Sequence, residues 1–130
     1  MLHNTQEIKK AFHHRLQGGK FMKDIVAKTI QVFPDEMIDH ITKHCWFISS
    51  FEDGWAFTLK ADELRQDEYL IFLSDELLKQ DKAQIIYTIV HEIGHVILGH
   101  KNAIRIPQSK KEVRNQERQA DEFARKYLRS

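Results

Sequence analysis

The 130-residue sequence predicts an α+β fold, with helices first, a small, mainly antiparallel three-stranded sheet in the middle, and two long helices last. Apolar residues recur every three or four positions up to residue 44 and again after residue 81, which is typical of amphipathic helices. Between them lie three short runs of aromatic and β-branched residues, which are typical of strands. Helices and strands in separate blocks favour α+β over an alternating α/β fold.

The first 44 residues predict three helices. Apolar residues spaced by four indicate a helix over 5–16, and the glycine pair that follows ends it. A second helix is predicted over 20–32. Pro34 then marks the start of a third helix, which carries acidic residues in its first turn and runs to about His44.

The region 45–74 predicts the sheet, with strands over 45–51, 55–59 and 69–74. The dipeptide Asp53-Gly54 separates the first two strands and is a strong signal for a hairpin between them. The third strand reads YLIFLS and is almost continuously apolar, which favours a strand covered on both faces.

The remaining residues predict a long helix within 81–100, capped by Asp81, a loop over 101–110, and a last helix over 111–128. The first of these helices has one wide apolar face, so we expect most of its surface to be buried. That face comprises Ile85, Ile86, Ile89, Val90, Ile93, Val96 and Ile97. We expect residues 1–130 to form one domain.

The composition argues against several classes of protein, namely nucleic-acid binding, disulfide-stabilised and membrane-spanning proteins. Twenty basic and nineteen acidic residues give a net charge of +1, so no strong overall field attracts nucleic acid or a membrane surface. A single cysteine, Cys45, cannot form an internal disulfide, and we expect it to pack as a small hydrophobe. No stretch approaches the roughly 20 apolar residues of a membrane span, and the N-terminal residues do not resemble a signal peptide. These features favour a cytoplasmic protein.

The pentapeptide His91-Glu92-Ile93-Gly94-His95 carries the main chemical signal. Two histidines four residues apart on a helix differ by about 40° around its axis, so both rings project from one face and suit two ligands of a zinc ion. Glu92 would then lie where it can act as general base on a metal-bound water. About 4 in 100 chains of this composition would contain such a motif by chance, so the alternative is a helix with two surface histidines.

The last helix supplies further candidates. Glu117 and Asp121 lie four residues apart, within the apolar stripe formed by residues such as Ala120 and Ala124. Acidic groups on a core-facing side are costly unless they have a partner or a metal. We therefore predict Glu117 as the third metal ligand and Asp121 as a hydrogen-bond partner of a ligand histidine. The alternative is a buried salt bridge to an arginine.

Other polar residues near the motif have less definite roles. His100 lies five residues after His95, about 140° around a continuous helix, so we expect it to face away and to interact with the helix dipole. Tyr87 and Tyr69 are candidates for stabilising the transition state, although a core position with a satisfied hydroxyl suits each of them better. The strand over 69–74 is a candidate shelf on which a substrate peptide pairs.

The segments HEIGHVILGH (91–100) and ERQADEFARKYL (117–128) together resemble the ImmA/IrrE-type gluzincin metallopeptidases and the single-domain minigluzincins. The tail pattern of that family, Glu-x-x-Ala-Asn/Asp-x-Phe-Ala, matches from Glu117 to Ala124. The resemblance implies a zincin-like fold in which His91, His95 and Glu117 bind zinc and Glu92 is the catalytic base. It also implies an intracellular protease whose substrate is a protein, for example a transcriptional repressor.

Two further interpretations stay open. In the first, the chain is a non-enzymatic regulator that keeps the zinc site and binds a partner protein. In the second, it is a binding module with a purely structural zinc. An intact Glu92 favours the enzyme, because a structural site needs no base. A site of two histidines and one glutamate also accepts manganese, iron or cobalt.

Overall fold

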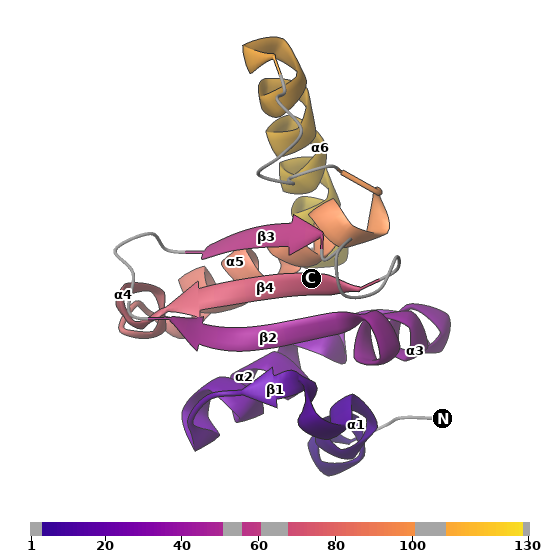
Figure 1. Ribbon diagram of the computed structural model, residues 1–130, viewed down its shortest axis with the longest axis vertical. Coiled ribbons are helices and arrows are strands. Elements are labelled where there is room, and N and C mark those ends of the chain that lie inside the picture. The colour runs from indigo at the N-terminus through magenta and orange to yellow at the C-terminus, as the bar shows by residue number, and fades with distance from the viewer. Residues whose placement is uncertain (1–3, 51–55, 61–67, 101–108, 129–130) are drawn as a thin grey trace.

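The computed structural model describes residues 4–50, 56–60, 68–100 and 109–128 and has the predicted α+β composition. Figure 1 shows the elements in chain order from indigo to yellow. They are α1 (Thr5–Phe12), the 3-10 turn η1 (His13–Arg15), β1 (Leu16–Gln17), α2 (Lys20–Ile30), α3 (Asp35–His44), β2 (Cys45–Ser50), β3 (Ala56–Lys60), β4 (Tyr69–Ser74), α4 (Asp75–Leu78), α5 (Lys82–Ile97) and α6 (Lys110–Leu128).

The sheet is mixed, and the prediction of a mainly antiparallel three-stranded sheet is wrong. Its four strands lie in the order β1-β2-β4-β3. The pairs β1–β2 and β2–β4 are parallel, whereas β3 and β4 are antiparallel. The predicted hairpin between the first two long strands is also wrong, because β4 lies between them; Asp53-Gly54 itself falls outside the described residues. The almost continuously apolar strand, β4, occupies one of the two inner positions, where both of its edges are paired.

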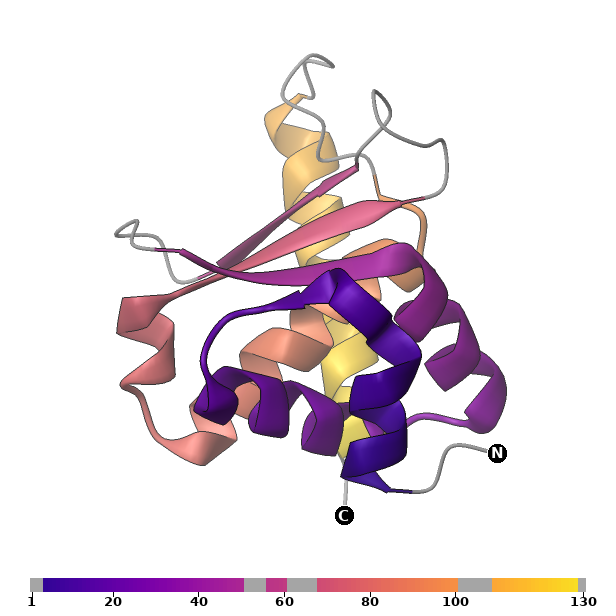
Figure 2. The same ribbon diagram turned by 60° about the horizontal axis from the view of Figure 1, so that its bottom comes forward.

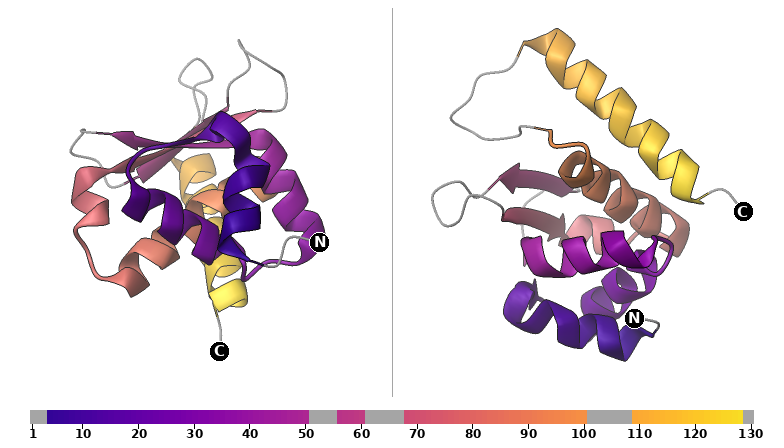
Figure 3. Two further views of the ribbon diagram at one scale, coloured as in Figure 1. Left: turned by 90° about the horizontal axis from the view of Figure 1, so that it is seen from below. Right: turned by 90° about the vertical axis from the view of Figure 1, so that its right-hand side faces the viewer.

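The helices pack against one face of this sheet, as Figures 2 and 3 show from two directions. In the parallel register of β2 and β4, Phe47 lies beside Ile71, and both side chains are fully buried on the helix-covered face. Trp46 and Leu70 pair on the opposite face, where both are half-buried. The hydrophobic core therefore lies between the sheet and the helices, and β4 is fully packed on one face only.

Local signals explain where the helices begin. Asn4, Ser74 and Asp81 each accept a hydrogen bond from a backbone N–H in the first turn of α1, α4 and α5. The predicted cap at Asp81 is thereby confirmed. The predicted helix over 5–16 is shorter than expected, because His13 has a positive φ of 55° and leads into η1 and the short strand β1.

Helix α5 is central to the helical layer, with α6 packed along one side and α2 along another (Figure 3). Its predicted apolar face is confirmed, since Ile85, Ile89 and Ile93 are fully buried. The amino-terminal half of α6 extends beyond the sheet in Figure 1, and the buried residues of this helix are Ala120, Phe123 and Ala124. No helix in the described ranges is long and apolar enough to cross a membrane.

Candidate metal centre

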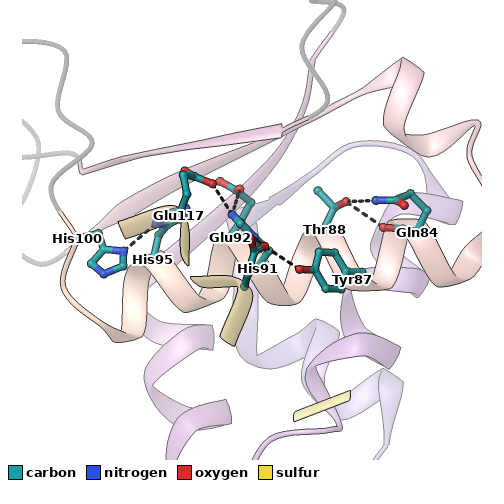
Figure 4. Close-up of polar contacts among 9 residues, drawn as sticks. Gln84, Tyr87, Thr88, His91, Glu92, His95, His100 and Glu117 are labelled. Carbon is teal, nitrogen blue, oxygen red and sulfur yellow. Dashed lines mark hydrogen bonds and ion pairs between the residues drawn. The ribbon is translucent and has the colours of Figure 1, made fainter. Parts of the chain in front are cut away.

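Helix α5 brings the motif residues together. His91, Glu92 and His95 each offer a ligand atom, and these atoms lie within 4.8 Å of one another. His91 is half-buried, while Glu92 and His95 are 6% and 2% exposed. The side chains project toward a common point in Figure 4. Three polar groups with this separation on a mostly buried helix are suited to hold a metal ion.

A glycine within the motif allows the second helix to approach. A Cβ atom on Gly94 would lie only 2.9 Å from Cδ1 and 3.3 Å from Cβ of Phe123 on α6. The missing side chain therefore sets the close spacing of the two helices. The small residues Ala120 and Ala124, both fully buried, form the same contact side of α6.

This close approach of the two helices places the carboxylate of Glu117 beside the Nε2 atoms of both His91 and His95. Its Oε2 lies 2.9 Å from Nε2 of His91, and its Oε1 lies 3.2 Å from Nε2 of His95. Tetrahedral zinc with bonds of about 2.0–2.2 Å places neighbouring ligand atoms about 3.3 Å apart. The donor set, two imidazole nitrogens and one carboxylate at nearly that spacing, fits a catalytic zinc site of the His₂Glu type.

The acidic pair is more exposed than the sequence argument assumed. The side chains of Glu117 and Asp121 are 52% and 41% exposed, so the premise that both are buried in the core is wrong. Val113, which belongs to the same stripe, is 43% exposed. The amino-terminal half of α6 extends past the sheet (Figure 1), which leaves the inner side of this half, with Val113 and Glu117, open to solvent. The pair faces α5, but it lies at the rim of the site.

Asp121 lies on the outer side of the first histidine. Its Oδ1 is 2.9 Å from Nδ1 of His91 and also accepts a hydrogen bond of 2.7 Å from the hydroxyl of Tyr87. Burial opposes ionisation of Asp121, but the bond from Tyr87 and the neighbouring His91 lower its pKa overall. A charged Asp121 holds the proton of His91 on Nδ1 and leaves the lone pair of Nε2 facing Glu117.

Tyr87 therefore does not supply a free electrophile. Burial, and next the bond to Asp121, raise the pKa of Tyr87 to about 12. Its hydroxyl lies on the Nδ1 side of His91, away from the nitrogen that faces Glu117 (Figure 4). Tyr69, the other candidate for stabilising the transition state, packs against the hydrophobic core. Cys45 is fully buried as predicted, and burial raises the pKa of its thiol to about 12.

The environment of His95 favours the neutral imidazole. Burial, the largest influence, lowers the pKa of His95 to about 4, while the carboxylate of Glu117 opposes this shift. A neutral ring is the form that binds metals, because a protonated nitrogen has no lone pair to share.

His100 lies beside His95, which contradicts the prediction that it faces away. Helix α5 ends at Ile97, and Gly99 adopts a left-handed conformation with φ of 70°. The N–H of His100 donates to the carbonyl of His95 at 2.9 Å, and that of Gly99 donates to Val96 at 3.1 Å. These are the two bonds of a Schellman motif, which reverses the backbone direction. Gly99 was the available signal, because a glycine at this place commonly ends a helix.

The reversal brings the two rings into hydrogen-bond contact. Nδ1 of His100 lies 2.8 Å from Nδ1 of His95, and Nε2 of His100 lies 2.7 Å from Oε1 of Gln119 on α6. His100 is 8% exposed. Sequence reasoning missed both His100 and Gln119 as neighbours of the candidate centre.

Taken together, the fold and the site define an α+β protein with a candidate HExxH metal centre shared by two helices. Among protein families, the model described as Peptidase U49 matches residues 82–130, which span the same two helices and less than half of the chain. This similarity supports a peptidase family and proteolytic function; the ImmA/IrrE-type gluzincin group stays an expectation. No curated protein sequence and no solved structure matches the chain significantly.

Proposed function

We propose that this chain is a zinc-dependent metallopeptidase that hydrolyses peptide bonds in a protein substrate. The observation that carries the proposal is the convergence of His91, His95 and Glu117, from two helices, beside the buried carboxylate of Glu92. The similarity of residues 82–130 to a peptidase family supports the same reaction class.

Each residue then has a definite task. His91, His95 and Glu117 would bind a zinc ion, which supplies the Lewis acidity that activates water and polarises the carbonyl. Glu92 takes a proton from the attacking water as the new carbon–oxygen bond forms. It then delivers that proton to the amine nitrogen as the carbon–nitrogen bond breaks. Asp121 fixes the orientation of the His91 ring throughout.

The sheet changes the expected place of the substrate. The strand predicted as a shelf, β4, lies between β2 and β3, so both of its edges are occupied. Among the described strands, β3 pairs only with β4 and lies at the edge of the sheet next to α5. We therefore assign the pairing edge to β3, where an extended peptide would add as a further strand. Thr88 and Gln84, one and two turns before Glu92 respectively, line the same side of α5 (Figure 4).

The proposal also includes the biological setting that the family resemblance implies. The substrate would be an intracellular protein such as a transcriptional repressor, bound directly and without nucleic acid. The alternative, a regulator that binds a partner without cutting it, becomes an outcome of the experiments below.

The first test measures metal content. Wild-type protein purified without added zinc should contain about one zinc per chain, because three donors of the proper type converge. Glu117→Ala should lose most of this metal. Glu122→Ala is the matched control, since Glu122 is an exposed glutamate on the same helix, and its metal content should equal that of wild type. Wild-type protein that binds no zinc when it is offered would contradict the proposal.

The second test separates the enzyme from a binding protein. Glu92→Gln should keep the zinc and lose cleavage of a fluorogenic peptide library by about 100-fold or more, because no base takes the proton of the water. Full cleavage by Glu92→Gln would exclude the mechanism. Zinc binding without cleavage by wild-type protein would support the non-enzymatic regulator instead.

A further inference from the structure

A series of hydrogen bonds extends from His95 away from the candidate metal site. It comprises His95, His100 and Gln119, and each bond is short: 2.8 Å between the two Nδ1 atoms and 2.7 Å from His100 Nε2 to Gln119 Oε1. The first two rings are 2% and 8% exposed, so water has little access to the bond between them. The role predicted for His100, an interaction with the helix dipole, does not account for this series.

The direction of these bonds is coupled to the state of His95. Of two neutral imidazoles joined through their Nδ1 atoms, one must donate and the other accept. The amide oxygen of Gln119 can only accept, so Nε2 of His100 carries its proton and Nδ1 of His100 carries a lone pair. His95 then donates from Nδ1, and its Nε2 keeps the lone pair that faces Glu117.

We propose that His100 and Gln119 are positioning residues that hold His95 in the tautomer able to bind a metal through Nε2. The inference deepens the proposed function, since it rests on His95 being a ligand. His91 receives the equivalent support from the Asp121 carboxylate at 2.9 Å. The two ligand histidines are thus oriented by different groups, one by an acid and the other by a second histidine.

The series also joins the two helices that carry the candidate metal ligands. His95 belongs to α5, His100 follows directly after the Schellman turn, and Gln119 lies on α6 two residues after Glu117. Helix α6 therefore acts on both nitrogens of His95: Gln119 acts on Nδ1 through His100, and the carboxylate of Glu117 approaches Nε2.

The test measures zinc affinity by competition with a chromophoric chelator. His100→Phe keeps a ring and removes the acceptor, and Gln119→Met keeps the length and removes the amide. Each should weaken zinc binding by about 10- to 100-fold, the usual effect of losing an outer hydrogen-bond partner. His100→Asn, which keeps an acceptor near the position of Nδ1, should restore most of the affinity. Gln80→Met, at an exposed glutamine that bonds the carbonyl of Glu76, is the control and should bind zinc like wild type.

Nitrogen-detected NMR of the zinc-loaded protein gives an independent readout. His95 should carry its proton on Nδ1, and His100 should carry its proton on Nε2. A His100 protonated at Nδ1, or wild-type affinity in both His100→Phe and Gln119→Met, would overturn the inference. Because Gln119 is exposed, its variant tests the inference even where a change at His100 disturbs folding.

The outcomes distinguish this inference from the proposed function. Zinc binding that responds to both positions, without any peptide cleavage, would support the positioning role and contradict the peptidase. If the variants at both positions cleave peptide and bind zinc like wild type, the result would support the peptidase and contradict the positioning role. Wild-type protein that takes up no zinc would contradict both.

Discussion

At the scale of single residues, the two histidines of the candidate centre differ in their surroundings. His91 is half-buried and contacts two acidic side chains that are exposed to solvent. His95 is almost fully buried and contacts Glu117 on one side and His100 on the other. This difference in burial, more than the number of neighbouring charges, makes His95 the group whose protonation matters for the stability of the metal-free protein.

We predict that the metal-free protein loses stability as the pH falls from about 6.5 toward 4. The pKa of His95 is lowered from 6.5 to about 4 by burial, so the unfolded chain takes up a proton in this range before the folded chain does. The contribution of neutral His95 to the free energy of unfolding is fully present above pH 6.5. Within this window it decreases by at most about 1.4 kcal/mol per pH unit as the pH falls. Urea unfolding of chelator-treated protein across this range measures the effect.

The control for this prediction is His95→Gln, whose side chain does not titrate. Carboxylates also titrate near pH 4, so the informative quantity is the difference between the two proteins. The free energy of unfolding of His95→Gln should depend less steeply on pH between 6.5 and 4. Equal slopes would show that His95 does not contribute.

At the scale of elements, the contact between α5 and α6 determines the site. Gly94 faces Phe123 so closely that the two helices have no room for a methyl group between them. Three of the candidate side chains lie on one side of this contact and two on the other: His91, Glu92 and His95 on α5, and Glu117 and Asp121 on α6. The helix spacing therefore controls whether the carboxylate of Glu117 reaches both rings.

We predict that Gly94→Ala destabilises the metal-free protein and weakens zinc binding. Alanine improves helix propensity by about 1 kcal/mol, but overpacking a tight contact costs about 1–3 kcal/mol. The overpacking prevails because the added methyl also lies 3.3 Å from Cβ of Phe123, which cannot move without its backbone. The unfolding midpoint and chelator competition measure the two effects.

The matched variant is Gly94→Ala combined with Phe123→Ala, which removes Cγ and Cδ1, the two atoms of Phe123 nearest to the added methyl. Their loss should relieve most of the contact, so the two substitutions together should cost less than the sum of their separate effects. A Gly94→Ala protein more stable than wild type would contradict the tight spacing of the helices.

The sequence predicted elements governed by local periodicity and missed those governed by distant contacts. The helix starting after Asp81 follows from a cap and an apolar face within one segment. The order of the strands does not, because β2 pairs with β4 across the segment that contains β3. An Asp-Gly signal describes a local turn, whereas the pairing of YLIFLS with both β2 and β3 depends on contacts between segments that are distant in the sequence.

The candidate site shows the same division. The spacing of His91 and His95, and that of Glu117 and Asp121, is a property of single helices and could be predicted. The exposure of Glu117 depends on how far α6 extends past α5, which no local pattern records. The prediction for His100 is wrong because it requires a continuous helix through Gly99, where the backbone in fact reverses.

At the scale of the whole molecule, the candidate metal site is built from segments that are far apart in sequence. His91 and Glu117 are 26 residues apart, and residues 101–108 between them are outside the described structure. A metal that binds both helices in the folded state, and neither in the unfolded state, stabilises the fold by mass action.

We therefore predict that zinc raises the melting temperature. At free zinc about 100 times the dissociation constant, the stabilisation is about 2.7 kcal/mol, which corresponds to roughly 10 °C for a chain of this size. Differential scanning calorimetry with and without a chelator measures the shift. Glu117→Ala should show little of it, whereas Glu122→Ala should behave like wild type. An equal shift in Glu117→Ala would mean that zinc acts elsewhere on the protein.

The arrangement of the donors has a consequence for how this architecture changes in evolution. The candidate ligands, the candidate general base and their outer hydrogen-bond partners all lie between Lys82 and Leu128, in two adjoining helices and the turn after the first. The match to a peptidase family likewise begins at residue 82. Under the proposed function, these two helices carry all of the catalytic residues, so the sequence of the sheet beneath them can diverge as long as it buries the same apolar face. Selection on substrate choice would then act mainly on the first 80 residues, while selection on the reaction would act on the last 50.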